Sequence, residues 1–209
     1  RTLHLAYDVT DMLRKGDNAV SMLLGNGYFH EGCFNNYTIE NYGSPRFILQ
    51  MKLEYADGRT EYVCSDESWK EAHSPIVFNN LHRGEIYDAN LEIPGWYTAG
   101  LDESSLTNAV IKEAPQGRLT ANMGPTDKVM ETLKPVSFEK LEDGSWKADF
   151  GKVISGWVRF EGVNVSKGDT IKVKLLSEYP SDRCEYICAA DGKVTTNPKF
   201  TWFVFREAV

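Results

Sequence analysis

The feature that most constrains the fold is an alternation of apolar and polar residues at every second position, which recurs along the chain. In residues 46–64, RFILQMKLEYADGRTEYVC, every second residue from Phe47 to Tyr55 is apolar, with glutamine, lysine and glutamate between the later ones. A period of two places the apolar side chains on one face of an extended strand, whereas a helix needs a period of 3.6. Asp57-Gly58 is a common hairpin turn, so this stretch predicts two antiparallel strands.

The same alternation predicts further strands at residues 18–25, 156–165 and 169–178. Only DVTDMLRKG, residues 8–16, has the signals of a helix, with Thr10 as a capping residue and Gly16 as a stop. Short strands separated by turn residues are typical of antiparallel β-sandwiches. The sequence therefore predicts an all-β chain of two antiparallel, jelly-roll-like β-sandwich domains in tandem.

A turn-rich segment divides the pattern. Residues 112–128, KEAPQGRLTANMGPTDK, concentrate proline, glycine and polar residues and show no alternation. With 209 residues the chain is long enough for two domains of about 100 residues each. We expect one domain over residues 1–115 and a second over residues 116–209.

Composition excludes several classes of function. The net charge is −7 and the positive residues do not cluster, so we expect no nucleic-acid partner. The apolar runs are too short to span a membrane. A nucleophile elbow, a glycine-rich phosphate loop and an H-E-x-x-H motif are all missing from the sequence. The four cysteines, Cys33, Cys64, Cys184 and Cys188, leave buried thiols, a single disulfide and a zinc site open.

Two loop-like stretches have the composition of a binding site. Residues 25–43, GNGYFHEGCFNNYTIENYG, hold five aromatic residues and four asparagines, and residues 74–96 add further amides and carboxylates. Aromatic rings stack on sugar faces, while amides and carboxylates bond to sugar hydroxyls. The same oxygens suit calcium, which takes six to eight of them. The alternative is that the aromatics anchor the loops and the asparagines satisfy turns.

Five phrases of the sequence resemble one known family in order and spacing. They are YDVTDMLRKGDNAVSMLLGNGYF, YADGRTEYVCSDESWK, SPIVFNNLHRGEIYDANLEIPGW, DFGKVISGWVRFEGVNVSKGDTIKVKLLSE and NPKFTWFVFREAV. Together they cover nearly the whole chain and resemble the N-terminal β-sandwich region of bacterial α-L-rhamnosidases.

The resemblance implies that the parent protein is an inverting glycoside hydrolase that releases terminal L-rhamnose. In that family an (α/α)6 catalytic barrel follows these sandwiches and carries the general acid and base. We expect the chain to be cut from a longer protein at both ends, to lack those carboxylates and to have no hydrolase activity alone. The expected role is that of a non-catalytic accessory region that supports the barrel and binds rhamnose-containing oligo- or polysaccharides; the alternative is a scaffold without a ligand site. The expected location is periplasmic or extracellular.

The resemblance also implies a place for ligands. In some members an Asp-Asn pair of this sandwich reaches a calcium ion, and Asn35-Asn36 match that pair here. Replacing Asp with Asn removes a charge, so we expect weak calcium binding at most and no required cofactor. The expected metal ligands are Asn35, Asn36 and Asn79. The expected carbohydrate-binding residues are Tyr28, His30, Asn35, Asn36, Tyr37, Asn41, Tyr42, Glu85 and Asp88.

Two departures from the family pattern set this chain apart. Lys152 and Val153 stand at polar positions of the DFGKVISGW phrase, and Leu106 replaces a tryptophan. We therefore expect a divergent member whose preferred sugar the sequence leaves open.

Overall fold

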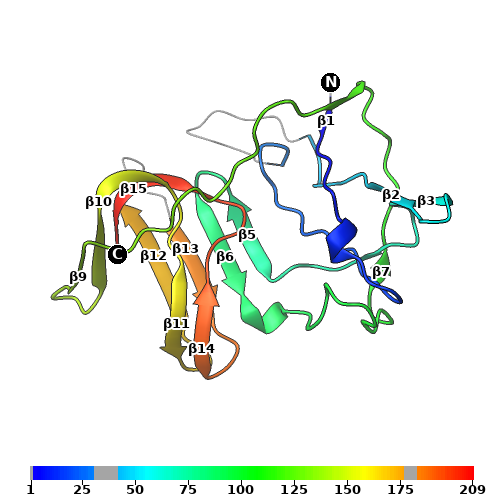
Figure 1. Cartoon of the computed structure of the whole chain (residues 1–209). Coiled ribbons are helices and arrows are strands. Elements are labelled where there is room, and N and C mark those ends of the chain that lie inside the picture. Colours follow the sequence, from blue (N-terminus) through cyan, green and yellow to red (C-terminus); the bar gives the residue numbers. More distant parts are fainter. Residues whose placement is uncertain (1, 31–41, 177–182) are drawn as a thin grey trace. The chain divides into compact units, whose positions relative to one another are not determined.

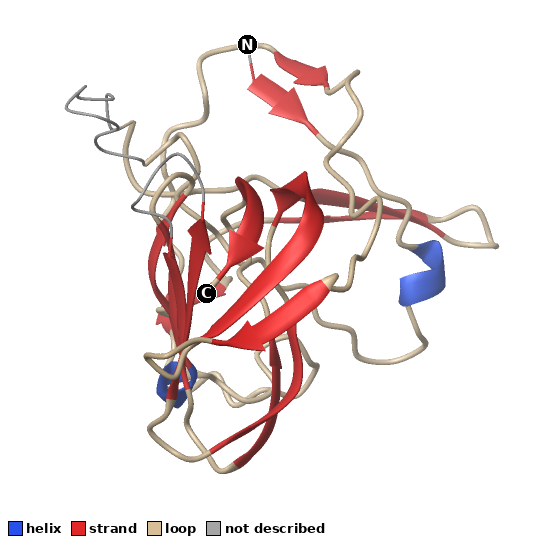
Figure 2. Cartoon of the chain, turned by 90° about the vertical axis from the view of Figure 1, so that its left-hand side faces the viewer, coloured by secondary structure: helices blue, strands red, loops and turns tan. Residues whose placement is uncertain are grey.

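The computed structural model of the chain describes residues 2–30, 42–176 and 183–209. Over these residues the predicted all-β fold is confirmed. Its only helical elements are two 3-10 turns, η1 (Thr10–Met12) and η2 (Ala89–Leu91). Figure 2 shows these two turns among the strands. None of the helical segments in the described ranges is long and apolar enough to cross a membrane.

The chain forms two compact units, and each draws on several stretches of sequence. The first unit contains residues 1–22, 47–73 and 93–131, and the second contains residues 23–46, 74–92 and 132–209. The domain boundary near residue 115 stays a prediction, since these units are groupings in space rather than contiguous segments.

The first unit is built from three separate two-stranded sheets. β2 (Gln50–Glu54) and β3 (Thr60–Cys64) form the predicted hairpin, with Gly58 in the left-handed region at φ 85°. β4 (Lys70–Glu71) pairs antiparallel with β7 (Thr107–Asn108), and β1 (Thr2–His4) pairs in parallel with β8 (Leu119–Ala121).

The second unit contains one seven-stranded sheet with the order β5-β6-β13-β12-β15-β10-β9 (Figure 1). Its strands are β5 (Ile76–Asn80), β6 (Gly84–Asp88), β9 (Ser137–Lys140), β10 (Trp146–Gly156), β12 (Thr170–Leu176), β13 (Arg183–Ile187) and β15 (Phe203–Ala208). A separate ribbon pairs β11 (Phe160–Val165) with β14 (Gly192–Thr196).

The core of the second unit lies on one face of the large sheet. Its buried residues are Val173, Leu175, Phe203, Phe205 and Ala208, and the side chains of Val158 and Phe160, at the start of the β11–β14 ribbon, pack against them. Among the described residues every buried one belongs to this unit.

Three details differ from the sequence-based expectations. Residues 18–25 are not a strand: no neighbouring strand pairs with them, so the alternation gives no ladder. The β6–β13 and β1–β8 pairs are parallel, which a period of two does not distinguish from antiparallel pairing. The turn η1 is held by Asp8, whose Oδ1 accepts bonds from the Thr10 backbone N–H and hydroxyl, rather than by a Thr10 cap.

Candidate functional site

Asn26, at the start of the aromatic loop (residues 25–43), is fixed to strand β5 by a pair of amide hydrogen bonds. The Asn26 backbone N–H donates to Oδ1 of Asn79 at 2.8 Å, and Nδ2 of Asn26 donates to the Asn79 carbonyl at 3.0 Å. Asn79 therefore uses both its side-chain and its main-chain oxygen to hold Asn26, and its role as a metal ligand stays a prediction.

Strand β6 places a buried carboxylate against the segment that leads into β15. Glu85 is 3% exposed, and both of its carboxylate oxygens accept the Lys199 N–H at 3.0 Å. Its Oε2 also accepts the Phe200 N–H at 2.8 Å. Thr201 in turn donates its hydroxyl to the Leu81 carbonyl at 3.2 Å, so residues 199–201 are fixed to the β5–β6 hairpin.

Phe200 of the same segment, residues 199–201, also contacts the start of the aromatic loop at Gly25. A Cβ atom at Gly25 would lie 2.4 Å from the ring of Phe200, closer than side chains can approach. Gly25 is therefore needed for contact between the loop backbone and that ring. Phe200 therefore connects the two: its backbone N–H bonds to the buried carboxylate of Glu85, and its ring contacts Gly25, the first residue of the loop.

Burial raises the pKa of the Glu85 carboxyl above its ordinary value. The N–H groups of Phe200 and Lys199, and then the positive charge of Lys199, act in the opposite direction by stabilising the carboxylate. The group sits where a charge is costly unless it is bonded, and the backbone supplies those bonds.

Aromatic side chains at the two ends of the loop remain exposed. Tyr28 is 63% exposed and lies edge-on to His82, with 6.0 Å between ring centroids. Tyr42 is 61% exposed, and its ring centroid lies 5.8 Å from that of Phe29. The His30 ring is held through Nδ1, which lies 2.9 Å from the Gly43 carbonyl oxygen.

Asp88, at the end of β6, caps the 3-10 turn η2. Its Oδ1 accepts the backbone N–H of Asn90 at 3.0 Å and the side-chain Nδ2 at 2.8 Å, which caps η2. Nearby, Tyr87 stacks on Tyr186 with 5.1 Å between ring centroids and donates its hydroxyl to Glu92. Burial and the Glu92 bond raise the pKa of Tyr87, which stays protonated as a donor.

The structure thus brings some of the predicted site residues together and leaves others untested. Asn79 and Glu85 lie opposite each other in the β5–β6 hairpin register. Asn35, Asn36, Tyr37 and Asn41 lie outside the described residues, so their part in sugar or calcium binding stays a prediction. Within the described ranges, histidine, cysteine and carboxylate side chains form no group of three able to hold a metal ion.

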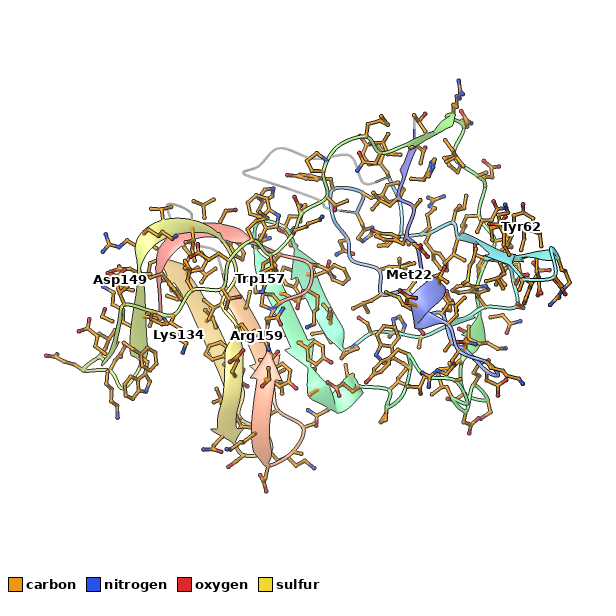
Figure 3. The ribbon with its side chains drawn as sticks, viewed as in Figure 1. Met22, Tyr62, Lys134, Asp149, Trp157 and Arg159 are labelled. Carbon is orange, nitrogen blue, oxygen red and sulfur yellow. The ribbon has the colours of Figure 1, made fainter. Side chains whose placement is uncertain are left out.

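A narrow apolar cleft opens beside the same strands. Tyr87, Tyr186 and Trp157 line it together with core residues of β12 and β15; Figure 3 labels Trp157. Its volume of about 30 Å³ holds one or two water molecules, so a sugar ring does not fit.

The sequence reasoning missed the segment at residues 199–201, which completes the base of the loop. Its backbone donors bond to Glu85 across 114 positions of sequence. The sequence alone carries no clear signal for this contact: Glu85 stands in GEIYD with a second acidic residue, Asp88, and only its burial shows that it requires donors from elsewhere.

These observations define an all-β protein in which Gly25 and Asn26, at the start of the aromatic stretch, are fixed to a large mixed sheet. Comparison with known proteins gives the particular family. Residues 1–131 match the family model described as "Alpha-L-rhamnosidase N-terminal domain". The chain belongs to this family.

Individual relatives agree with this assignment. The chain is 33% identical to an α-L-rhamnosidase of Formosa agariphila over 98% of its length, and 28% identical to one of Streptomyces avermitilis over 99%. It spans only 24% and 21% of those two relatives.

Solved structures show the same fold. An α-L-rhamnosidase structure from Dictyoglumus thermophilum matches 79% of the chain with a TM-score of 0.74 and 31% identity, and the match covers 20% of that protein. One from Aspergillus terreus matches 99% of the chain with a TM-score of 0.84 at 24% identity, and the match covers 26% of that protein.

Proposed function

We propose that this chain is the non-catalytic accessory region of an α-L-rhamnosidase-type glycoside hydrolase. The observation that carries the proposal is the match of residues 1–131 to the N-terminal domain of that family, together with the small share of each relative that the chain spans. In this proposal the remaining three quarters of such a protein hold the catalytic machinery, and the region described here supports it.

The geometry of the loop base supports an accessory role. Inverting hydrolysis needs a carboxylic acid and a carboxylate about 6.5–9.5 Å apart, both facing a water-filled cleft. Glu85 is buried and bonded to two backbone N–H groups, and Asp88 caps η2. Both carboxylates are engaged in holding the fold, and in this proposal the acid and base belong to a catalytic domain elsewhere in the same protein.

A glycan contact is the second function that the structure favours. Tyr28 and Tyr42 are both more than half exposed and precede and follow residues 31–41, the stretch with the predicted ligands. Exposed tyrosine rings offer flat apolar faces to sugars. The proposed ligand is a rhamnose-containing oligo- or polysaccharide, bound weakly because one shallow site desolvates few groups. The proposed ligands of a weakly bound calcium ion are Asn35, Asn36 and Asn79.

Hydrolysis of an aryl α-L-rhamnoside tests the main proposal. We expect no turnover from the 209-residue chain and turnover from the full-length polypeptide. Activity of the short chain that survives repurification and is lost on Glu85→Gln substitution contradicts the accessory role.

Calorimetric titration with L-rhamnose at millimolar concentration, with and without calcium, tests the glycan contact. Tyr28→Ala with Tyr42→Ala should abolish the heat, whereas Tyr62→Ala, on β3 of the first unit, should not.

A further inference from the structure

An apolar row of the seven-stranded sheet runs out of the core onto an exposed edge. Leu175 of β12, Ala208 of β15, Ala148 of β10 and Phe138 of β9 are successive cross-strand partners. Partners in register lie on the same face of a sheet. The first three are 3%, 5% and 9% exposed, whereas Phe138 is 62% exposed. The face that is buried in the middle of the sheet is therefore uncovered at β9.

A second aromatic ring enlarges this uncovered face. Trp146 lies diagonally across from Phe138, and the two rings stack with 4.9 Å between centroids and 10° between planes. Trp146 is 49% exposed, and Val136, just before β9, is 71% exposed. Figure 1 shows β9 as the outer strand of the sheet, beside β10. An edge strand of a free-standing protein is usually protected by charges or by a covering segment, not by paired aromatic rings.

The opposite face of the same two strands has the character of a solvent surface. Lys147, between Trp146 and Ala148 in sequence, points to that face and forms an ion pair with Glu207 at 2.9 Å. It also stands opposite Glu139 in the register of β9 and β10. One face of the β9–β10 pair thus carries Lys147 and Glu139, whereas the other carries the stacked rings of Phe138 and Trp146, with Lys140 opposite Trp146 as its one charged residue among the paired residues of these two strands. An exposed aromatic pair of this kind is typical of a surface that meets another layer of protein.

The chain leaves the sheet close to this patch. Ala208 belongs to the apolar row, and Val209 is bonded to Lys174 by two backbone hydrogen bonds of 2.7 and 2.8 Å. Phe138 is two strands away from Ala208, a distance of about 10 Å. The family model that the chain matches describes an N-terminal domain. The relative from Formosa agariphila is about four times as long as the chain. In a polypeptide as long as this relative, the residues after position 209 would start two strands away from the exposed rings.

We propose that Phe138 and Trp146 form the docking surface for the part of the full-length polypeptide that follows Val209. The proposal rests on the proposed function, since it requires this region to be the first part of a longer enzyme. The fitting partner is an apolar segment of the same polypeptide, with aliphatic, aromatic or proline side chains that lie flat on the two rings. Because the contact is apolar, salt should not weaken it.

Hydrogen–deuterium exchange in the full-length polypeptide and in the 209-residue chain tests the docking. We expect amides of residues 137–147 to exchange at least tenfold more slowly in the full-length polypeptide, and exposed amides of the β2–β3 hairpin to exchange equally in both. Equal exchange at residues 137–147 overturns the proposal.

Substitutions supply a second, independent measurement. Phe138→Ser with Trp146→Ser should lower the melting temperature of the full-length polypeptide but leave that of the 209-residue chain nearly unchanged. Val204→Ser, on β15 and 54% exposed, is the matched control and should change neither. Equal effects of the double variant on both chains contradict docking. A wild-type 209-residue chain that forms dimers abolished by Trp146→Ser, without protection in the full-length polypeptide, assigns the patch to a second copy and also overturns the proposal.

The outcome for docking and the outcome for function are separable. Protection of residues 137–147 in a full-length polypeptide that does not hydrolyse aryl rhamnosides supports the docking surface and removes the proposed activity. Hydrolysis without protection does the reverse.

Discussion

Glu85 shows how one side chain connects the sequence feature that first suggested a binding site to the packing of the sheet. Its buried carboxylate accepts the backbone N–H groups of Lys199 and Phe200, and the Phe200 ring supports Gly25. A carboxyl group is accommodated in this position because its donors are fixed backbone groups, which need no further side-chain ordering.

Removal of this carboxylate should be costly. Glu85→Ala leaves two backbone N–H groups without an acceptor, and we expect the free energy of unfolding to fall by about 2–5 kcal/mol. Glu85→Gln keeps one acceptor oxygen and should cost less. Urea unfolding measures both, with Glu54→Ala, on an exposed side chain of β2, as the control that changes little. An equal loss in the Ala and Gln variants contradicts the hydrogen-bonding role.

The pH dependence of the contribution that Glu85 makes to the free energy of unfolding has a definite sign. Burial raises the folded-state pKa of Glu85 above the ordinary carboxyl value of 4.5, so the folded state holds the proton more tightly than the unfolded state. This contribution to stability is present below pH 4.5 and is lost as the pH rises through the raised pKa. The Gln variant lacks it, so its stability should fall less over the same interval.

At the scale of elements, the irregular part of β10 is held by an ion pair. The register between β10 and β15 shifts between Asp149 and Ile154. Asp149, labelled in Figure 3, receives Nε and Nη2 of Arg206 at 2.9 and 2.8 Å and accepts the Gly151 N–H at 2.7 Å. Gly151 has a φ of 75°, so the bulge combines a left-handed glycine with a bidentate pair.

The ion pair between Asp149 and Arg206 should persist to strongly acidic pH. The Arg206 bonds, with the Gly151 N–H, lower the pKa of Asp149 from 3.8 to about 2. Its stabilising contribution is therefore present above pH 3.8 and is lost as the pH falls through about 2. Asp149→Asn should be less stable than the wild type at pH 6, and the two should converge near pH 2. Asp127→Asn, in the turn-rich segment, is the control; a constant Asp149→Asn difference from pH 6 to pH 2 contradicts the assignment.

At the scale of the whole molecule, much apolar surface remains uncovered. The first unit contributes to this surface, because its three two-stranded sheets contain no buried residue in the ranges that the structure describes.

Protection against exchange should therefore be unequal within the chain. Isolated two-stranded sheets are marginal in water, whereas β12 and β15 bury the core. We expect amides of β2 and β3 to exchange at least a hundredfold faster than those of β12 and β15 in the 209-residue chain. Exchange mass spectrometry measures this, and similar rates in the two units would show that the first unit has a core of its own.

The sequence by itself determined the all-β class, the hairpin around Asp57-Gly58 and the strand at residues 170–176, because alternation and turn chemistry are local properties. It also carried the family resemblance. Only the tertiary structure decided that residues 18–25 have no strand partner, that β6 and β13 run in parallel, and that the carboxylate of Glu85 meets residues 199–200. It likewise decided that an aromatic pair emerges at β9. These features depend on which distant segments pack together, and a period of two is the same for a strand with a neighbour, without one, or at an uncovered edge.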